Sequence, residues 1–196
     1  MRHALIAAAL LVAPAAVMAE GFSYTYLDAR YYSTDSDAIT VNQNGGVLTG
    51  SLALTPVLYV VGNASYGQSE DVTIAGVTGS FDAVAGSARI GAHHPLTEVL
   101  DVFANVGALY QEVMSNGGFD GKEDDVGYIG QVGLRLAVVP QVELTAFYGY
   151  QDIFDESNGG FTGELQYHAT ENWSAIASAN SSSSTDVYTV GARYRF

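Results

Sequence analysis

Cysteine is absent from the sequence, tryptophan occurs once, and only 7 of the 196 residues are lysine or arginine. Without cysteine the chain can form no disulfide and has no thiol for chemistry. The few basic residues stand against 21 acidic ones, and the resulting formal charge of −14 argues against nucleic acid as a partner. Long apolar runs are missing beyond residue 19, which excludes a helical membrane protein because a spanning helix needs about 18 consecutive apolar residues.

Residues 1–19 have the pattern of a secretory signal peptide. A basic start at Arg2 is followed by an apolar run over residues 4–12 and by small residues up to Ala19, after which cleavage is expected. Residues 20–196 then form one domain, as expected for a chain of this length. Loss of Arg2 leaves 21 acidic against 6 basic residues, so the mature chain carries a net charge of −15.

What the sequence has in quantity is glycine and aromatic residues, arranged in an alternating pattern. The C-terminal stretch Thr185–Phe196 displays it most clearly, because the residues at every second position back from Phe196 are apolar or aromatic. Arg193 and Arg195 lie between them. A period of two is typical of a β-strand and not of a helix. A strand with these two faces separates an apolar medium from a polar one.

The same alternation recurs along the chain in ten segments, most of them about 9 to 14 residues long, which suits a tilted crossing of a bilayer. An even number of strands is typical of closed bacterial outer-membrane barrels. The pattern therefore predicts an all-β fold, a closed antiparallel transmembrane β-barrel of ten strands, with eight strands as the alternative. The predicted strands are Phe22–Ser33, Leu48–Leu54, Leu58–Tyr66, Phe81–His93, Leu100–Gln111, Tyr128–Leu136, Val142–Gln151, Thr162–His168, Trp173–Asn180 (the weakest) and Thr185–Phe196.

Short connections alternate with longer polar ones between these segments. In bacterial outer-membrane barrels the short turns lie in the periplasm and the longer loops lie outside the cell. Many of the aspartate and glutamate residues lie in the longer connections, so the external loops should be acidic. The short connections are expected at Leu54–Val57, His93–Val99, Ala137–Gln141 and His168–Asn172, and the longer ones at Thr34–Gly46, Gln68–Ser80, Met114–Glu123, Ile153–Gly159 and Ser181–Ser184.

Charged residues on the inward-facing side of the strands form the candidate site. Charges inside a small barrel must pair, because a lone buried ion costs several kcal/mol. Two interpretations stay open: a structural ladder of ion pairs that fills the lumen, and a charged constriction for small solutes. The predicted lumen charge network consists of Asp28, Arg30, Arg89, Asp101, Arg135, Glu143, Glu164 and Arg193, and Arg195 should also point inward.

Strand pairing predicts the partners within this network. Residues equally far from a hairpin turn face each other across the two strands, and the first and last strands must pair to close the barrel. The expected pairs are Arg135 with Glu143, Arg89 with Asp101, and Arg193 with Asp28.

The three histidines of the mature chain are expected at periplasmic turns, away from the outer rim where outer-membrane hydrolases place their catalytic groups. His93 and His94, with Glu98 nearby, are ligand types for a transition metal, but water-exposed turn residues are the expected interpretation. No serine, histidine and acid are predicted at one level of the barrel. We therefore expect no catalytic residue, no metal and no cofactor.

The terminal strand resembles the last strand of Gram-negative outer-membrane barrels, whose closing aromatic residue is read by the barrel-assembly machinery. Tyr194 and Phe196 would carry that assembly signal here. The mature start, the Gly-Tyr-Gln-Asp segment around Tyr150, the turn at Glu171–Trp173 and the Gly-Ala-Arg-Tyr-Arg-Phe ending together resemble the Ax21-like family of bacterial outer-membrane β-barrel proteins. The resemblance implies location in the bacterial cell outer membrane and supplies no catalytic or ligand-binding residue.

These features lead to three functional hypotheses. The first is a non-enzymatic outer-membrane barrel with a structural, surface-interaction or host-recognised role. The second is a narrow porin-like channel for small solutes, and the third is an outer-membrane enzyme. The expected partners are outer-membrane lipid, lipopolysaccharide and, through the C-terminal strand, the barrel-assembly machinery. The barrel is expected to be a monomer and to bind no nucleic acid.

Overall fold

The computed structural model describes residues 22–36, 42–74, 76–118, 121–182 and 185–196. The predicted signal peptide, residues 1–19, lies outside the described residues. In the described part of the chain, no helix is long and apolar enough to cross a membrane.

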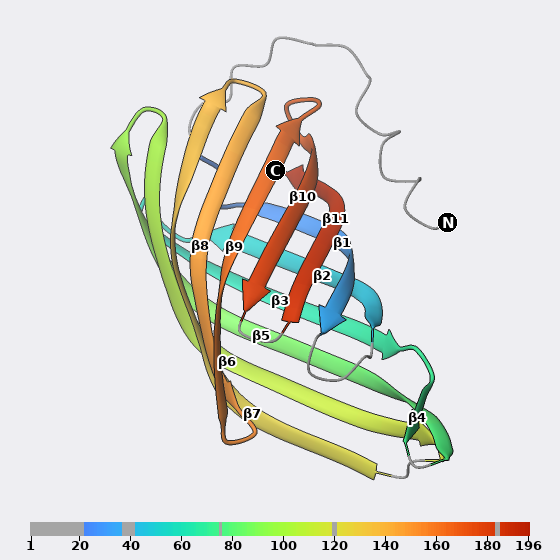
Figure 1. The fold of residues 1–196 in the computed structure, drawn as a ribbon. Helices are drawn as coiled ribbons and strands as arrows, with labels where there is room; N and C mark the ends of the chain where they lie inside the picture. Colours follow the sequence, from blue (N-terminus) through green and yellow to red (C-terminus); the bar gives the residue numbers. More distant parts are fainter. Residues whose placement is uncertain (1–21, 37–41, 75, 119–120, 183–184) are drawn as a thin grey trace.

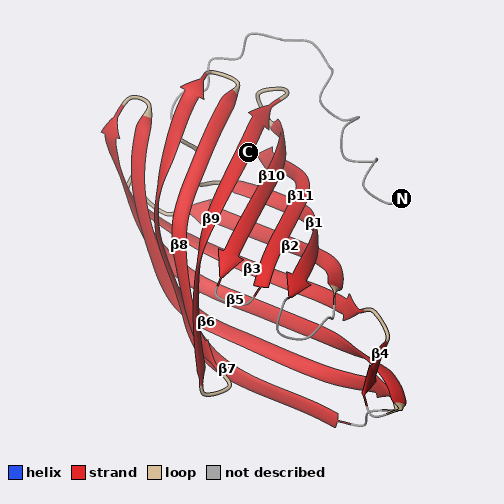
Figure 2. Cartoon of the chain, viewed as in Figure 1, coloured by secondary structure: helices blue, strands red, loops and turns tan. Residues whose placement is uncertain are grey.

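The described elements are all strands of one antiparallel sheet that closes into a barrel (Figures 1 and 2). Sequential neighbours pair except for β3 and β4, β1 pairs with β11, and β3 pairs with β5. The short β4 also pairs with β5 and continues the line of β3, so ten strands form the barrel, as predicted. The strands are β1 Tyr26–Ser36, β2 Gln43–Ala53, β3 Leu58–Ser69, β4 Val72–Ile74, β5 Val77–Thr97, β6 Leu100–Gly117, β7 Gly121–Val139, β8 Val142–Ile153, β9 Glu156–His168, β10 Trp173–Ser182 and β11 Thr185–Arg195.

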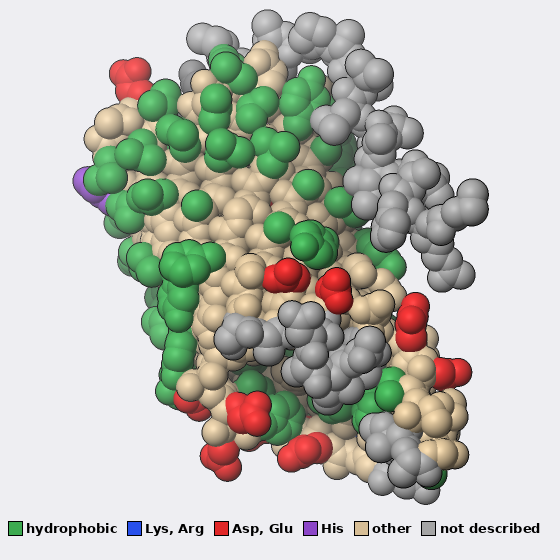
Figure 3. Space-filling model, in the orientation of Figure 1, with side chains coloured by type: hydrophobic (Ala, Val, Ile, Leu, Met, Phe, Trp, Pro, Cys, Tyr) green, Lys and Arg blue, Asp and Glu red, His purple; other side chains and the backbone are tan. Residues whose placement is uncertain are grey.

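The alternation in sequence becomes an apolar outer wall and a polar lumen. In β1, Leu27 and Tyr31 are 50% and 55% exposed, while Asp28 between them is 0% exposed. In a membrane barrel the exposed apolar face meets lipid, and the alternate residues fill the interior. Apolar side chains cover much of the outer surface in Figure 3, and acidic side chains gather at the end opposite the short turns. Trp173–Asn180 lies within β10, which removes the eight-strand alternative.

The three longest strands are much longer than predicted. β5, β6 and β7 contain 21, 18 and 19 residues, whereas about 9 to 11 residues cross a bilayer. Together with β4 they project beyond the barrel at the lower right of Figure 1. Much of the predicted loops Gln68–Ser80 and Met114–Glu123 is therefore strand. The alternation did not predict this extension, because a strand surrounded by water has no apolar face to alternate with a polar one.

Three further predicted connections are also shorter than expected. The predicted loop Thr34–Gly46 is shortened because β1 ends at Ser36 and β2 begins at Gln43. The predicted loop Ile153–Gly159 is a two-residue turn at Phe154 and Asp155, whose φ angles are 57° and 58°. Paired positive φ values fit the mirror-image turns that suit the twist of hairpins. The predicted turn His93–Val99 is wrong, because β5 continues to Thr97 and β6 begins at Leu100.

Candidate functional site

One group of buried charges lies where β1, β9 and β11 line the lumen. Asp28 and Arg193 face each other across the β1–β11 pair. Arg193 donates from Nε to Asp28 Oδ1 at 2.6 Å and from Nη2 to Oδ2 at 2.9 Å, a two-point pairing that fixes both side chains. Its Nη1 donates to Gln166 at 2.6 Å. The predicted Arg193–Asp28 pair is therefore present and fully inside the barrel.

Arg30 connects this pair to a second acid. Its guanidinium donates to Asp28 at 2.5 Å and to Glu164 at 2.6 Å. Glu164 also lies 3.4 Å from Arg193. Two arginines thus share two carboxylates, so each of the four charges has an opposite charge within ion-pair distance.

The predicted pair of Arg135 and Glu143 is also present, with Nε 2.7 Å from Oε1. The two residues are not directly opposite, because Arg135 faces Thr145 and Glu143 faces Ala137 across the β7–β8 pair. The turn lies between Val139 and Val142 and is not centred on Val139, so with the register irregularity beside it the strands are shifted by two residues relative to the prediction. The long side chains bridge this diagonal on one face of the sheet.

Residues Phe22–Thr25 precede β1 and form what we call the N-terminal plug. Arg135 donates to the carbonyl oxygen of Ser23 at 3.1 Å, and its guanidinium lies 5.1 Å from the ring centre of Phe22 and 4.7 Å from that of Tyr24. These distances are within the range of a cation–π contact. The prediction that β1 begins at Phe22 is wrong, because the strand starts at Tyr26 and the plug turns into the lumen.

Tyr24 is the centre of the plug, with only 6% of its surface exposed. Its ring stacks on His93 with ring centres 3.9 Å apart and lies 4.6 Å from the ring of Tyr59. Its hydroxyl donates to Asp101 Oδ2 at 3.1 Å. His93 Nδ1 lies 3.0 Å from the same oxygen, so Asp101 is held by the plug and by β5.

An aromatic layer of Tyr59, Phe103 and Phe147 joins the plug to the walls of the barrel. Tyr59 and Phe103 are buried with Tyr24 in one apolar cluster, and Phe147 packs against it. The Tyr59 ring lies flat over Gly91, where a Cβ atom would come within 2.3 Å of the ring. Only glycine allows this approach, and it lets the Tyr59 ring lie against the neighbouring strand β5.

Arg89 has no acidic partner among the described residues. The predicted pair with Asp101 is wrong, because β5 continues past the expected turn and Arg89 lies opposite Gly107, while Asp101 lies opposite Pro95. Arg89 is only 8% exposed, and the one side-chain hydrogen bond it makes to a described residue, from Nη1 to Asn105 Oδ1, is long at 3.4 Å. Its Nε has no hydrogen-bond partner in that part of the chain.

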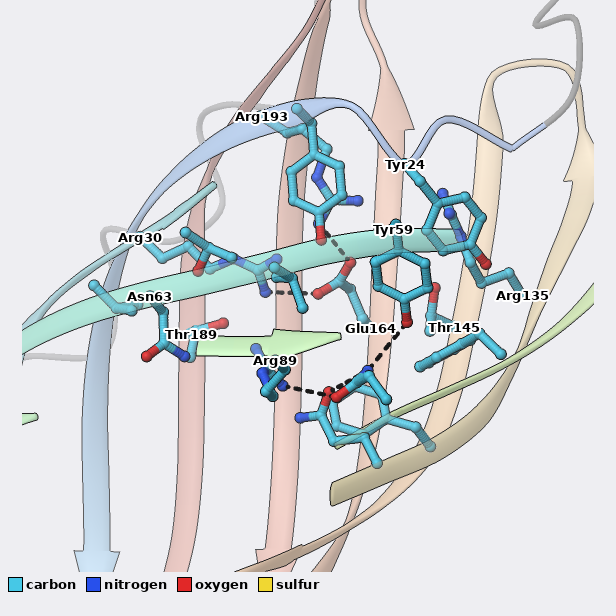
Figure 4. Close-up of a pocket in the computed structure, with 18 residues that line it drawn as sticks. Tyr24, Arg30, Tyr59, Asn63, Arg89, Arg135, Thr145, Glu164, Thr189 and Arg193 are labelled. Carbon is cyan, nitrogen blue, oxygen red and sulfur yellow. Dashed lines mark hydrogen bonds and ion pairs between the residues drawn. The ribbon is translucent and has the colours of Figure 1, made fainter. Parts of the chain in front are cut away.

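A cavity of about 230 Å³ lies in the lumen beside these residues (Figure 4). Tyr24 and Arg135 line it at the end of the barrel where β1 begins, and Asn63 and Thr189 line it farther along the barrel. The charged residues that line it are Arg30, Arg89, Arg135, Arg193 and Glu164. The arrangement is thus rich in fixed positive charge.

The structure also groups a serine, a histidine and an acid that the sequence analysis did not place at one level. His168 Nδ1 lies 2.9 Å from Ser174 Oγ, and His168 Nε2 lies 4.0 Å from Glu143 Oε2. Neighbouring strands β9 and β10 bring the first two together, which a count of residues from the turn at 169–172 could have found. All three are buried, and none lines the lumen cavity.

The histidines do not occupy water-exposed turns as predicted. His93 is 13% exposed inside the barrel and His168 is 6% exposed, whereas His94, the next residue in β5, is exposed. Adjacent residues of a strand point to opposite faces, so His93 and His94 are directed apart. In the described part of the chain no group of three or more metal-ligating side chains is present.

The residues of the predicted assembly signal lie at the end of β11. The Tyr194 ring is 5.0 Å from Trp173 and 5.0 Å from Phe196 in edge-to-face contacts. Phe196 is 76% exposed. Arg195, which was expected to point inward, donates to the carbonyl oxygen of Glu171 at 2.8 Å and is partly buried.

Comparisons with known proteins agree with this architecture. The NanC porin is 8% identical, with 87% of this chain and 100% of that chain covered and a TM-score of 0.55. The translocator domain of autotransporter NalP from Neisseria meningitidis is 11% identical over 91% of both chains, with a TM-score of 0.52. OprG from Pseudomonas aeruginosa is 13% identical over 90% of this chain and 98% of that chain, with a TM-score of 0.51. At these identities the likeness is one of fold.

No curated protein sequence matches the chain. Residues 5–196 match the family described as outer membrane protein beta-barrel domain. That match covers nearly the whole sequence and agrees with the closed ten-strand barrel. The chain therefore belongs to the outer membrane protein β-barrel domain family and is a protein of the bacterial outer membrane.

Proposed function

We propose that this protein is a non-enzymatic barrel with a closed lumen, whose role is structural or depends on contacts made by its outer end. The observation that carries the proposal is the filling of the lumen near the N-terminal plug. The Asp28–Arg193 ion pair occupies one side, and Tyr24 with the aromatic layer occupies the other. A barrel interior filled by side chains is a packed core and offers solutes no continuous path.

The outer end is the surface available to partners. β5, β6 and β7 continue past the barrel, and acidic side chains gather at this end (Figure 3). A strongly negative projection favours a partner with a positive surface, through long-range attraction that weakens with salt. This combination supports a surface-interaction or host-recognised role.

The non-enzymatic part of the proposal rests on the burial of the serine group. Ser174 is 3% exposed, and Gln166 Nε2 lies 3.2 Å from its hydroxyl. Glu143 is already paired with Arg135. A nucleophile needs space for a substrate and donors for the developing negative charge, and this serine adjoins no described cavity. We interpret the group as polar packing between β9 and β10.

A narrow channel for small solutes is the second candidate. The observation that favours it is the lumen cavity, in which four arginines and one glutamate meet. A ring of arginines is a common way to select anions in a pore. The NanC and KdgM porins share the barrel fold with this chain at TM-scores of 0.55 and 0.50.

A liposome-swelling assay separates the two candidates. Vesicles containing the refolded mature chain are diluted into isotonic solutions of a neutral monosaccharide or of its uronic acid. We expect swelling no faster than in protein-free vesicles, because the filled lumen blocks both solutes. Swelling in the uronic acid that exceeds both the neutral sugar and the protein-free control would contradict the closed-lumen proposal and support the channel.

We further propose that the protein is a monomer whose apolar wall contacts outer-membrane lipid and lipopolysaccharide. We also propose that the barrel-assembly machinery recognises Tyr194 and Phe196. The exposed ring of Phe196 at the end of β11 is consistent with recognition of this terminus. We also propose that the chain is a member of the Ax21-like family, which the C-terminal sequence and the short motifs support.

A further inference from the structure

We propose that the lumen cavity holds a binding site for a small oxyanion, a carboxylate or a phosphate, centred on Arg89. The site goes beyond the proposed function, because an anion can bind in a barrel whether or not ions pass through it. It rests on three observations: an unmatched buried charge, the polar groups around that charge, and the volume beside it.

One lumen arginine has no acid beside it among the described residues, because the fourth lumen acid, Asp101, binds Tyr24 and His93 instead. Arg30 and Arg193 share Asp28 and Glu164, and Arg135 is paired with Glu143. Arg89 is the cavity-lining arginine that remains, with no carboxylate within ion-pair distance among the described residues. A guanidinium stays charged in a protein, and a buried charge without a partner costs several kcal/mol. An anion in the cavity would remove that cost.

The polar groups around Arg89 do not neutralise its charge. Asn105 Nδ2 donates to the hydroxyl of Tyr59 at 3.1 Å and to Gln131 Oε1 at 3.3 Å, which directs its carbonyl oxygen toward Arg89. That one neutral acceptor is 3.4 Å away and leaves Arg89 Nε without a partner. Asn105 is itself 8% exposed, so both members of this group are buried and line the cavity.

The cavity volume limits the ligand. Its 230 Å³ is below the roughly 300–1,000 Å³ of sites for drug-sized molecules. Arginine pairs with planar carboxylates and with phosphates through several charge-assisted hydrogen bonds. A small carboxylate or phosphate therefore fits both the space and the chemistry, while a long anionic polymer does not.

The test is isothermal titration of the refolded mature chain in detergent micelles, with inorganic phosphate and with acetate as probes at constant ionic strength. We expect the wild-type protein to bind at least one probe, and Arg89→Gln to weaken that binding by about tenfold or more, since hydrogen bonds to a charged group are being removed. Asn105→Asp should weaken it similarly, because a carboxylate placed beside Arg89 would take the position of the ligand.

Lys122→Gln is the matched control, because it also removes one positive charge but lies at the outer end, where Lys122 pairs with Glu112 at 2.9 Å. Its affinity should equal that of the wild type. Asn105→Asp keeps the test decisive if Arg89→Gln does not fold. The proposal is overturned if the wild type binds neither probe, or if every cavity variant that folds binds as tightly as the wild type. It is also overturned if Lys122→Gln weakens binding as much as the cavity variants do.

Discussion

Replacing Asp28 by alanine is expected to destabilise the folded barrel by about 3–5 kcal/mol, the cost of breaking a buried ion pair by removing one partner. Asp28 is completely buried and accepts hydrogen bonds from both Arg193 and Arg30. Without it, only Glu164 remains for two guanidinium groups inside the lumen. Equilibrium unfolding in denaturant, followed by the fluorescence of the single tryptophan, Trp173, measures the change.

Asp35→Ala is the control for this prediction, since Asp35 lies in the same strand but is exposed at its outer end. We expect it to change the free energy of unfolding by less than about 0.5 kcal/mol, as for ordinary surface substitutions. Asp28→Asn, which keeps the shape and removes the charge, should fall between the two. Equal unfolding midpoints for Asp28→Ala and Asp35→Ala would show that the lumen ion pairs do not hold the barrel together.

Replacing Tyr24 by alanine is expected to release the N-terminal plug. The substitution removes the stack on His93, the contact with Tyr59 and the hydrogen bond to Asp101. Truncation of a well-packed aromatic side chain costs about 3–5 kcal/mol, while the plug is anchored elsewhere mainly by Arg135. Limited proteolysis of the detergent-solubilised protein should therefore trim the N-terminus much faster than in the wild type and leave the rest of the barrel intact.

Tyr31→Ala provides the comparison, because Tyr31 is in the same region of the chain but faces outward and is 55% exposed. Its trimming rate should equal that of the wild type. If Tyr24→Ala and Tyr31→Ala are trimmed at the same rate, then the plug is not held by its aromatic contacts.

The wall of the barrel could be predicted from the sequence because apolar and polar residues alternate along each strand and thereby indicate its two faces. In β1 and β11 the pattern gave both the strand pairing and the contact of Arg193 with Asp28, since those residues are opposite when the barrel closes. The Arg135–Glu143 contact also formed although the register differed by two residues, because long side chains bridge such a shift.

The interior of the lumen could not be predicted in the same way. Whether Tyr24 lines a strand or turns into the barrel depends on contacts with His93 and Tyr59, which are distant in sequence and lie on other strands. The unpaired state of Arg89 depends on the length of β5, and polar residues near its end gave no signal that the strand continued to Thr97. Contacts across the lumen join residues that are far apart in the sequence, and the alternation within a single strand cannot predict such contacts.

The central claim is that the lumen is closed, and planar-bilayer recording of the wild type beside Tyr24→Ala tests it most directly. The wild type should show no conductance steps above the bare bilayer, whereas Tyr24→Ala should show steps because the cavity would then connect to the mouth of the barrel beside the plug. Steps of equal size in both proteins would contradict the closed lumen and favour the channel.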